Sequence, residues 1–255
     1  MSAVRVAIAG ASGRMGLALL EAAAGTEGVT LGSALDLSAS TWGGVSIGTD
    51  VSLALRNADV LVDFTRPAGT LAHLQACLDA KRAMVIGTTG FDAAQLKEIR
   101  AAANRIPIVM APNMSVGVNV ALKLVELASR ALGPDYDVEV FEMHHRKKVD
   151  APSGTALKLG EVAAAARGTT VAKDGVFARE GQTGERKAGA IGFSVARGGD
   201  IVGDHTVYFA GPGERIEITH RSSSRATYAQ GAMRAAKFVH GRPPGLYDME
   251  DVLGL

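Results

Sequence analysis

The chain has 255 residues, and its 27 lysine and arginine residues nearly balance 26 aspartate and glutamate residues, which leaves a net charge of +1. Such a balance excludes a global field that would attract nucleic acid or a membrane surface, so we expect neither as a partner. The single cysteine, Cys77, excludes an intramolecular disulfide and a cysteine-rich zinc site, and we expect no metal. The sequence lacks a signal-peptide pattern and any run of ~20 apolar residues, which predicts a cytoplasmic protein.

The first half of the chain alternates strand and helix patterns. A short apolar strand at residues 5–9 leads through a glycine-rich turn into a helix that ends near Gly25, and a second strand follows at 29–35. Further buried strands and intervening helices are predicted at 59–64, 68–81, 83–87, 92–104 and 106–111. This alternation predicts an α/β fold with a Rossmann-like, doubly wound parallel sheet that binds ligands at the C-terminal ends of its strands.

The pattern changes after residue 115. A helix at 119–132, a strand at 136–143 and a helix ending near Arg167 are followed by strands with no helix between them, at 191–196, 201–210 and 215–220. Successive strands of this kind predict a second, α+β domain with an antiparallel or mixed sheet. The polar segment 172–190 is expected to be a mobile loop. A final helix at 224–239 precedes the tail "GLYDMEDVLGL", which we expect to pack back on the first domain.

The turn "GASGRMG" places glycines at Gly10, Gly13 and Gly16, a GxxGxxG spacing instead of the commoner GxGxxG. Glycines allow a tight turn and a close approach of pyrophosphate to backbone N–H groups at a helix N-terminus. Asp36 ends the second strand, 20 positions after Gly16, where a carboxylate can accept hydrogen bonds from ribose hydroxyls. Together these features favour dinucleotide binding over a purely structural turn.

The choice between NADH and NADPH depends on the residues around Asp36. Its carboxylate would repel a 2′-phosphate and Leu37 supplies no compensating cation, so NADH is favoured, although Arg14 lies in the phosphate loop and weakens this inference. The stretches "GTTG", 87–90, and "APNMS", 111–115, end predicted strands where a nicotinamide should lie. Ordinary turn chemistry is their alternative interpretation.

The stretch "EMHHRKKVDAPSGTA", residues 142–156, combines five potentially cationic side chains with a helix start. A solvated charged face is the simplest interpretation of the basic run alone. However, Pro152 and Ser153 open a helix with free N–H groups, and the missing side chain of Gly154 lets an anion approach them. A second anionic group can be neutralised by Lys148, Arg146 or a histidine, so the stretch predicts a small dicarboxylate ligand.

The sequence resembles the dihydrodipicolinate reductase family over essentially the whole chain. The resemblance is carried by long motifs in the family's order: "VAIAGASGRMG", "VDFTRP", "MVIGTTGF", "APNMSVGVN", "HHRKKVDAPSGTA", "GFSVARGGDIVGDHTV" and "GLYDMEDVL". It implies that residues 1–115 and 223–255 form a dinucleotide-binding domain. Residues 116–222 are implied to bind substrate and to assemble a homotetramer.

The resemblance also implies roles for individual residues. His144 corresponds to the proposed acid/base residue and Lys148 to the proposed proton donor. The substrate carboxylates are assigned to His145, Gly154 and Thr155. The implied cofactor contacts are Gly10, Ala11, Ser12, Gly13, Arg14, Met15, Asp36, Gly87, Thr88, Thr89, Ala111, Pro112, Asn113 and Met114. One departure is Leu37, because many family members have a basic residue there that engages NADP.

The predicted function is therefore NAD(P)H-dependent reduction of a cyclic dicarboxylic imine in lysine and diaminopimelate biosynthesis. Hydride addition to a conjugated imine leaves an electron-rich intermediate that must be protonated, so a proton donor is required. An amino-acid dehydrogenase acting on a substrate such as aspartate is one alternative, and a nucleotide-sensing protein that docks nucleic acid is another. We expect the remaining histidines, His205, His220 and His240, to be structural, and we expect His73 and Cys77 not to bind metal.

Overall fold

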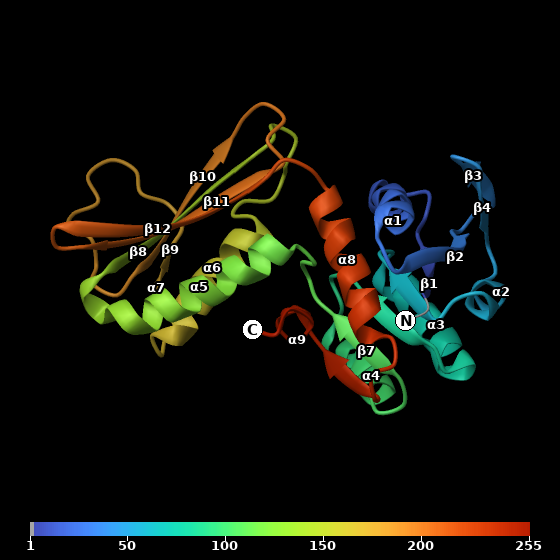
Figure 1. Cartoon of the computed structure of the whole chain (residues 1–255). Helices are drawn as coiled ribbons and strands as arrows, with labels where there is room; N and C mark the ends of the chain where they lie inside the picture. Colours follow the sequence, from blue (N-terminus) through green and yellow to red (C-terminus); the bar gives the residue numbers. More distant parts are fainter. Residues whose placement is uncertain (1–2) are drawn as a thin grey trace. The chain divides into compact units, whose positions relative to one another are not determined.

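The computed structural model describes residues 3–255, and these residues fall into two compact units. Unit 1 contains the chain up to Val116 together with Arg225–Leu255, and unit 2 contains Gly117–Ser224. In the colours of Figure 1, unit 1 therefore holds the blue and the red ends of the chain, while unit 2 holds its green-to-orange middle.

Unit 1 is built on an eight-stranded sheet with the order β13-β7-β6-β5-β1-β2-β4-β3. Its strands are β1 (Val4–Ala9), β2 (Val29–Leu35), β3 (Ser40–Trp42), β4 (Val45–Gly48), β5 (Val60–Asp63), β6 (Ala83–Ile86), β7 (Pro107–Met110) and β13 (Gly245–Tyr247). All neighbours pair in parallel except β3, which is antiparallel to β4. The strand order reverses between β1 and β5, which confirms the predicted doubly wound sheet.

Helices cover both faces of this sheet because its buried strands are apolar on both sides. Val6 and Ile8 face a core formed with α1 (Arg14–Gly25), α8 (Ala226–Val239) and α9 (Met249–Leu253). Ala7 and Ala9 face the other core, which is completed by α2 (Val51–Arg56), α3 (Pro67–Ala80) and α4 (Ala93–Ala102). The β3–β4 hairpin and α2 were not predicted, since these elements are too short to show a clear period.

The C-terminal tail packs on unit 1, as predicted. Strand β13 pairs in parallel with β7 and extends the sheet by one strand. The following helix, α9, is capped by Asp248 and buries Met249 and Val252 in the same core as α1 and α8. The tail therefore completes the side of the sheet that carries β7.

Unit 2 contains a five-stranded sheet with the order β12-β11-β8-β10-β9. Its strands are β8 (Asp137–His144), β9 (Gly175–Val176), β10 (Ile191–Arg197), β11 (Gly203–Gly211) and β12 (Glu214–Ser222). Strand β8 is parallel to β10 and antiparallel to β11, and β11 is antiparallel to β12. The predicted mixed sheet is thus confirmed, and its central strand, β8, ends at His144, the first residue of the histidine pair.

One face of the unit 2 sheet is covered by helices, as Figure 1 shows for α5 (Val116–Leu132) and α6 (Gly154–Ala166). Alternate residues such as Val140 and Phe209 point into this core. Helix α6 approaches the sheet so closely at Gly160 that a Cβ there would lie 2.4 Å from the Phe193 ring. The opposite face bears Phe141, which remains 37% exposed in this chain.

The polar segment 172–190, expected to be a mobile loop, is tied to the sheet by charge pairs. It contains most of the short helix α7 (Val171–Asp174) and strand β9. Arg179 binds both oxygens of Glu139 at 2.8 Å, and Arg186 binds Asp137 at 2.6 Å and Glu139 at 2.9 Å. The cationic residues of the loop therefore neutralise the acidic face of β8.

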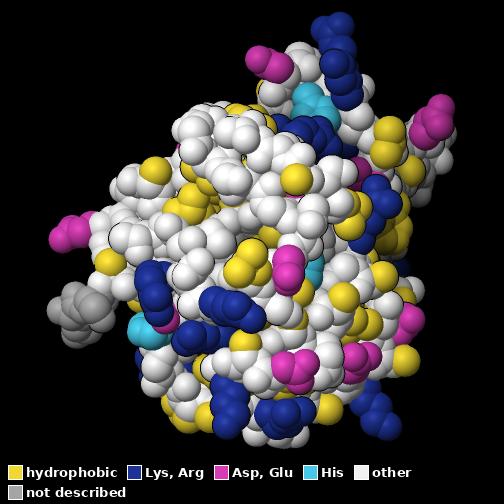
Figure 2. All heavy atoms as spheres, turned by 90° about the vertical axis from the view of Figure 1, so that its right-hand side faces the viewer, with side chains coloured by type: hydrophobic (Ala, Val, Ile, Leu, Met, Phe, Trp, Pro, Cys, Tyr) yellow, Lys and Arg dark blue, Asp and Glu magenta, His cyan; other side chains and the backbone are white. Residues whose placement is uncertain are grey.

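Basic and acidic side chains are both scattered over the face of the molecule that Figure 2 shows. No helix within residues 3–255 is both long enough and apolar enough to cross a membrane. Over the same residues, no three or more His, Cys, Asp or Glu side chains gather in a group that can hold a metal ion.

Candidate active site

The glycine-rich turn follows β1 at the C-terminal edge of the unit 1 sheet. Gly10 has a φ of +76°, and the N–H groups of Gly10 and Ala11 donate to the Leu35 carbonyl at 3.0 and 3.1 Å. A Cβ at Gly16 would lie 2.1 Å from the Gly10 carbonyl oxygen. Glycine is therefore required at both positions, one for its backbone conformation and the other for the close approach of α1 to the turn.

Helix α1 starts directly after this turn with its N-terminus free of side-chain caps. Its N-cap is Gly13, no side chain accepts a hydrogen bond at this cap, and no acidic residue lies in the first turn. The first helical residue, Arg14, is exposed. Uncapped N–H groups and the positive end of the helix dipole make this terminus suited to an anion.

Asp36 lies beside the turn, one residue beyond β2. Its Oδ2 accepts a hydrogen bond from the Ser12 N–H at 2.8 Å, and its Oδ1 accepts one from the Leu37 N–H at 2.7 Å. Partial burial opposes ionisation, but these two backbone hydrogen bonds outweigh it and lower the pKa of Asp36. The carboxylate is therefore ionised and keeps lone pairs for further donors, while the Leu37 side chain is 96% exposed.

A buried carboxylate, Asp63, organises the loop after β6. Its Oδ1 accepts hydrogen bonds from the hydroxyls of Thr65, Thr70 and Thr88 at 2.9, 2.8 and 2.9 Å, and its Oδ2 lies 2.5 Å from His73 Nδ1. Burial opposes ionisation, yet His73 and the threonines outweigh it, so the pKa of Asp63 is lowered. The predicted cofactor residue Thr88 is thus fixed by a network that the sequence did not reveal, with His73 as a carboxylate partner.

The two remaining cofactor stretches, 87–89 and 111–114, follow the adjacent strands β6 and β7. The Gly87 N–H donates to the Asp63 carbonyl at 2.9 Å, and a Cβ at Gly87 would lie 2.2 Å from the Phe64 ring. In the second stretch, Asn113 Oδ1 accepts a hydrogen bond from the Ser115 N–H at 2.9 Å and Met114 is buried. All predicted cofactor residues therefore lie in unit 1, after the C-terminal ends of β1, β2, β6 and β7.

In unit 2, the end of β8 holds a histidine–carboxylate pair. His144 Nδ1 lies 2.5 Å from Glu142 Oε2, and Glu142 is fully buried. Arg197 binds both carboxylate oxygens at 2.8 and 2.9 Å, and the Ser153 N–H donates to Oε1 at 3.0 Å. Burial opposes ionisation of Glu142, but Arg197, His144 and the Ser153 N–H lower its pKa. A buried carboxylate with this many donors is held ionised.

Ser153 connects this pair to the start of α6 and to another histidine. As the N-cap of α6, its Oγ accepts a hydrogen bond from the Ala156 N–H at 3.1 Å, and it lies 2.9 Å from His205 Nε2. The His205 ring contacts the His144 ring edge-on at a centroid distance of 5.0 Å. Burial and the neighbouring His144 lower the pKa of His205 to about 4, so this imidazole is neutral near pH 7.

The other predicted substrate residues lie in the segment between β8 and α6. Lys148 Nζ binds both oxygens of Asp150 at 2.8 Å. His145 follows β8 in a turn, and its buried Nδ1 has no hydrogen-bond partner among residues 3–255. Gly154 is the exposed first residue of α6, where a Cβ would meet no atom within 4 Å, and Thr155 follows it. The segment thus leads from the end of β8 to the start of α6, and Lys148 faces Asp150 within it.

Four residues of this cluster were not predicted as site residues: Glu142, Ser153, Arg197 and His205. The sequence held one usable signal, because residues two apart on a strand point to the same face, which places Glu142 beside His144. Arg197 and His205 come from β10 and β11, at sequence separations of 55 and 52 from their partners. His205, expected to be structural, contacts the His144 ring.

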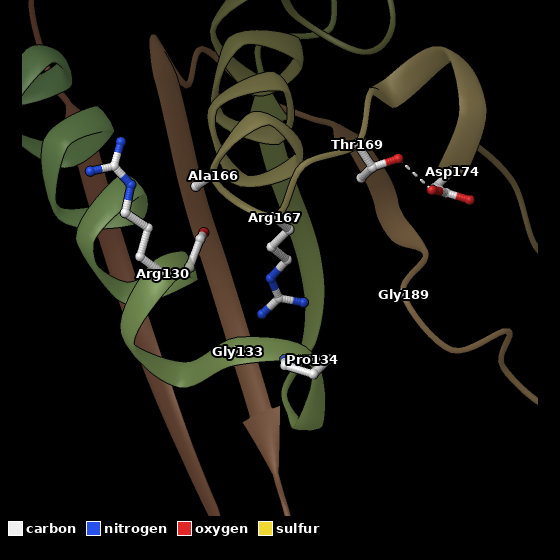
Figure 3. Close-up of a pocket in the computed structure, with 9 residues that line it drawn as sticks. Arg130, Gly133, Pro134, Ala166, Arg167, Thr169, Asp174 and Gly189 are labelled. Atoms are coloured by element: carbon white, nitrogen blue, oxygen red, sulfur yellow. Dashed lines mark hydrogen bonds between the residues drawn. The ribbon is translucent and has the colours of Figure 1, made fainter.

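A separate pocket of about 380 Å³ lies in unit 2 and is shown in Figure 3. Its lining residues, none of them a predicted site residue, are Ser129, Arg130, Gly133, Pro134, Ala166, Arg167, Thr169, Asp174 and Gly189. Arg167 donates from Nη1 to the Tyr136 carbonyl at 2.8 Å, while its Nε and Nη2 are closed off from solvent. Because a ligand in the pocket does not reach these two groups, we assign the pocket no role.

The combination of a doubly wound unit with a glycine-rich turn and a second unit with a mixed sheet defines the fold of two-domain dehydrogenases. GenD2 from gentamicin A biosynthesis, solved in complex with NAD, has this fold, with a TM-score of 0.63 at 15% identity over 99% of this chain and 91% of that one. At this identity the likeness concerns the fold alone.

The chain belongs to the dihydrodipicolinate reductase family. The family's N-terminal domain matches residues 4–114, and its C-terminal domain matches residues 117–253. The 4-hydroxy-tetrahydrodipicolinate reductase of Bordetella pertussis is 60% identical, covering 98% of this chain and 97% of that protein. The enzyme of the same name from Thiobacillus denitrificans is 58% identical over 99% of both chains. A dipicolinate-bound dihydrodipicolinate reductase from Paenisporosarcina sp. TG-14 has a TM-score of 0.81 at 27% identity over 98% of both chains.

Proposed function

We propose that the protein is an NAD(P)H-dependent reductase that converts a cyclic dicarboxylic imine, 4-hydroxy-tetrahydrodipicolinate, to tetrahydrodipicolinate in lysine and diaminopimelate biosynthesis. The relatives that carry this activity in their names match the chain over nearly its full length. The observation that carries the proposal is the junction of β8 and α6, where a carboxylate-paired His144 adjoins an exposed glycine at a helix start. This junction combines a proton-transfer group with an anion site.

Residues 1–115 and 223–255 are proposed as the dinucleotide-binding domain. The turn around Gly10 and the uncapped start of α1 suit a pyrophosphate, and the free lone pairs of Asp36 suit ribose hydroxyls. NADH is favoured over NADPH, because Asp36 would repel a 2′-phosphate and the exposed side chain beside it is Leu37. Thr88, fixed by Asp63, is proposed to contact the nicotinamide.

The proton chemistry is assigned to residues 116–222, the proposed substrate domain. When bound, the reduced nicotinamide supplies the hydride. His144 and Lys148 then supply the proton that the reduced substrate must receive, a contribution of roughly 10²- to 10⁴-fold to the rate. Asp150 holds the Lys148 ammonium in place, and the Glu142 carboxylate orients the His144 ring.

The two substrate carboxylates are assigned to different groups. His145, which directly follows β8, is proposed to bind one of them. The other is assigned to the start of α6 at Gly154 and Thr155, where the helix dipole favours an anion. Two fixed anion sites position the ring for reaction, which contributes to the rate through orientation.

We further propose a cytoplasmic homotetramer that assembles through unit 2. The sheet face opposite α5 and α6 exposes Phe141 on its central strand, β8. An aromatic side chain exposed in the middle of an open sheet face suits a surface that another chain covers. A partner subunit is therefore the proposed cover of this face.

Steady-state kinetics with enzymatically generated imine, with NADH and NADPH compared side by side, test this function. We expect turnover with both cofactors, a higher kcat/KM for NADH, and competitive inhibition by pyridine-2,6-dicarboxylate. Reduction of NAD by aspartate without inhibition by the dicarboxylate would instead identify an amino-acid dehydrogenase.

Replacement of Lys148 by alanine tests the assignment of the proton donor. The Lys148→Ala variant should lose about 10²- to 10⁴-fold in kcat, while its Kd for NADH should not change, because the proposed cofactor residues are elsewhere in the chain. Lys147→Ala, at the exposed neighbouring position, is the matched control and should keep its activity. Loss of NADH binding in the Lys148 variant would place this residue in a different site.

A further inference from the structure

We infer that Glu142 is a positioning residue for the reaction: its carboxylate, clamped by Arg197 and the Ser153 N–H, holds His144 in the tautomer with the proton on Nδ1. Only the expected effect on kcat rests on the proposed function; the tautomer of His144 does not. The unused ring nitrogen, Nε2, is then the atom that exchanges protons with the substrate.

The hydrogen-bonding capacity of Glu142 determines the direction of its bond to His144. Arg197 donates from Nη1 to Oε2 at 2.8 Å and from Nη2 to Oε1 at 2.9 Å, and the Ser153 N–H donates to Oε1 at 3.0 Å. A carboxylate surrounded by a guanidinium and a backbone donor stays ionised, and an ionised carboxylate only accepts hydrogen bonds. His144 Nδ1, 2.5 Å from Oε2, must therefore be the donor.

The groups that hold the Glu142 carboxylate and the His144 ring belong to three separate elements. Glu142 and His144 are both on β8, Arg197 ends β10, and Ser153 caps α6. Arg197 Nη2 also donates to the Asp150 carbonyl at 2.6 Å, which fixes the chain just before the helix start. Since Glu142 is fully buried, its charge needs all of these donors, and movement of the carboxylate is disfavoured.

The opposite edge of the His144 ring is kept open by a glycine. A Cβ at Gly203, the first residue of β11, would lie 2.9 Å from His144 Nε2. The ring side chain is 10% exposed, whereas the Glu142 side chain is 1% exposed. Glu142 therefore anchors the closed edge of the ring and leaves Nε2 as its reactive atom, as carboxylates do for other acid–base histidines.

Glu142→Gln is the diagnostic substitution because it preserves the shape of the side chain and replaces one acceptor oxygen by a donor NH2 group. The side-chain amide of the glutamine can donate to His144 Nδ1, which would move the ring proton to Nε2. We expect kcat to fall by about 10²- to 10⁴-fold with little change in the KM for NADH. Glu142→Asp keeps the charge and should recover part of the activity that the glutamine variant loses.

The tautomer is measured directly by long-range ¹H–¹⁵N NMR correlation on protein labelled with ¹⁵N-histidine, with resonances assigned through a His144→Asn variant. We expect Nδ1 of the His144 ring to carry a proton in the wild-type protein, and Nε2 to carry it instead in Glu142→Gln. The matched control is Glu139→Gln, also on β8 and also bound by arginines, Arg179 and Arg186. It should leave both the kcat and the His144 resonances unchanged.

An Nε2–H tautomer in the wild-type protein would overturn the inference, and so would a Glu142→Gln enzyme with wild-type kcat. The wild-type spectrum decides between the two tautomers even if the glutamine variant does not fold. An Nδ1–H ring in a protein without reductase activity would overturn the proposed function while supporting the role of Glu142 in holding the ring.

Discussion

The two buried carboxylates, Asp63 and Glu142, are both surrounded by hydrogen-bond donors. Asp63 accepts hydrogen bonds from three threonine hydroxyls and pairs with His73, and Glu142 is bound by Arg197, His144 and the Ser153 N–H. Unpaired, either carboxylate would cost several kcal/mol to bury. Each pairing adjoins a predicted site residue, so these charges fix side chains of the proposed site as well as the fold.

The cofactor preference can be tested at Leu37. In a Leu37→Arg variant, the exposed position beside Asp36 would offer a cation to a 2′-phosphate. A charge-assisted hydrogen bond of about 1.5–3 kcal/mol would raise kcat/KM for NADPH by roughly tenfold or more, with little effect on NADH. Side-by-side kinetics with both cofactors provide the measurement, and an unchanged ratio would show that the 2′-phosphate is read elsewhere.

His205 makes stability depend on pH. Its pKa is about 4 in the folded protein and 6.5 in the reference state, so the unfolded chain binds more protons between these values. The free energy of unfolding should therefore fall as the pH decreases from about 6.5 to about 4, by up to roughly 3 kcal/mol from this residue. Urea unfolding at several pH values should give a smaller loss for His205→Gln, and equal losses in both proteins would contradict the assignment.

At the scale of elements, short segments distant in the sequence complete the sheet and core of unit 1. Strand β13 extends the sheet beside β7, whose C-terminal end leads into the predicted cofactor stretch 111–114. Helix α9 then buries Met249 and Val252 against the core that holds α1 and α8. The tail thus stabilises the side of the sheet that bears part of the proposed cofactor site.

Met249→Ala tests this contribution. Met249 is 1% exposed, and truncating a buried side chain of this size costs about 2–5 kcal/mol. Leu246→Ala on β13 is the control, because Leu246 is 42% exposed and should cost far less. Trp42, the single tryptophan, packs against the same core and provides a fluorescence signal for urea unfolding of unit 1. Equal costs for both variants would show that α9 contributes little.

At the scale of the whole molecule, the open face of the unit 2 sheet is the surface that we propose a second subunit covers. Phe141 is more than a third exposed, although it lies on β8, the central strand of the sheet. The opposite face is covered by α5 and α6 of the same chain. A single chain therefore covers one side of this sheet with helices, and a second subunit is the proposed cover for the other.

Phe141→Glu should prevent this assembly by placing a charge in the proposed interface. We expect light scattering to report the mass of a tetramer for the wild-type protein and of smaller species for the variant. Leu53→Glu is the control, since Leu53 is 56% exposed on α2 of unit 1 and should not affect the mass. A tetrameric Phe141 variant would exclude this face as the interface.

The sequence alone determined much of the local structure. Strand β2 spans the predicted residues 29–35, and α8 lies within the predicted 224–239. Apolar periodicity and glycine spacing are properties of neighbouring residues, so the strand–helix alternation, the turn at Gly10 and the mixed sheet were all predictable. The His144 segment was recognisable for the same reason, since its basic run and helix start are contiguous.

Only the tertiary structure decided which partners these residues have. Arg197 and His205 reach the site from strands more than 50 residues away, and His73 and Thr88 meet at Asp63 from two different elements. No local pattern encodes such contacts, because strand order and register are set by the packing of the whole sheet. The sequence thus determined which groups are available for chemistry, and the folding of distant strands onto one another determined how each of them is oriented and charged.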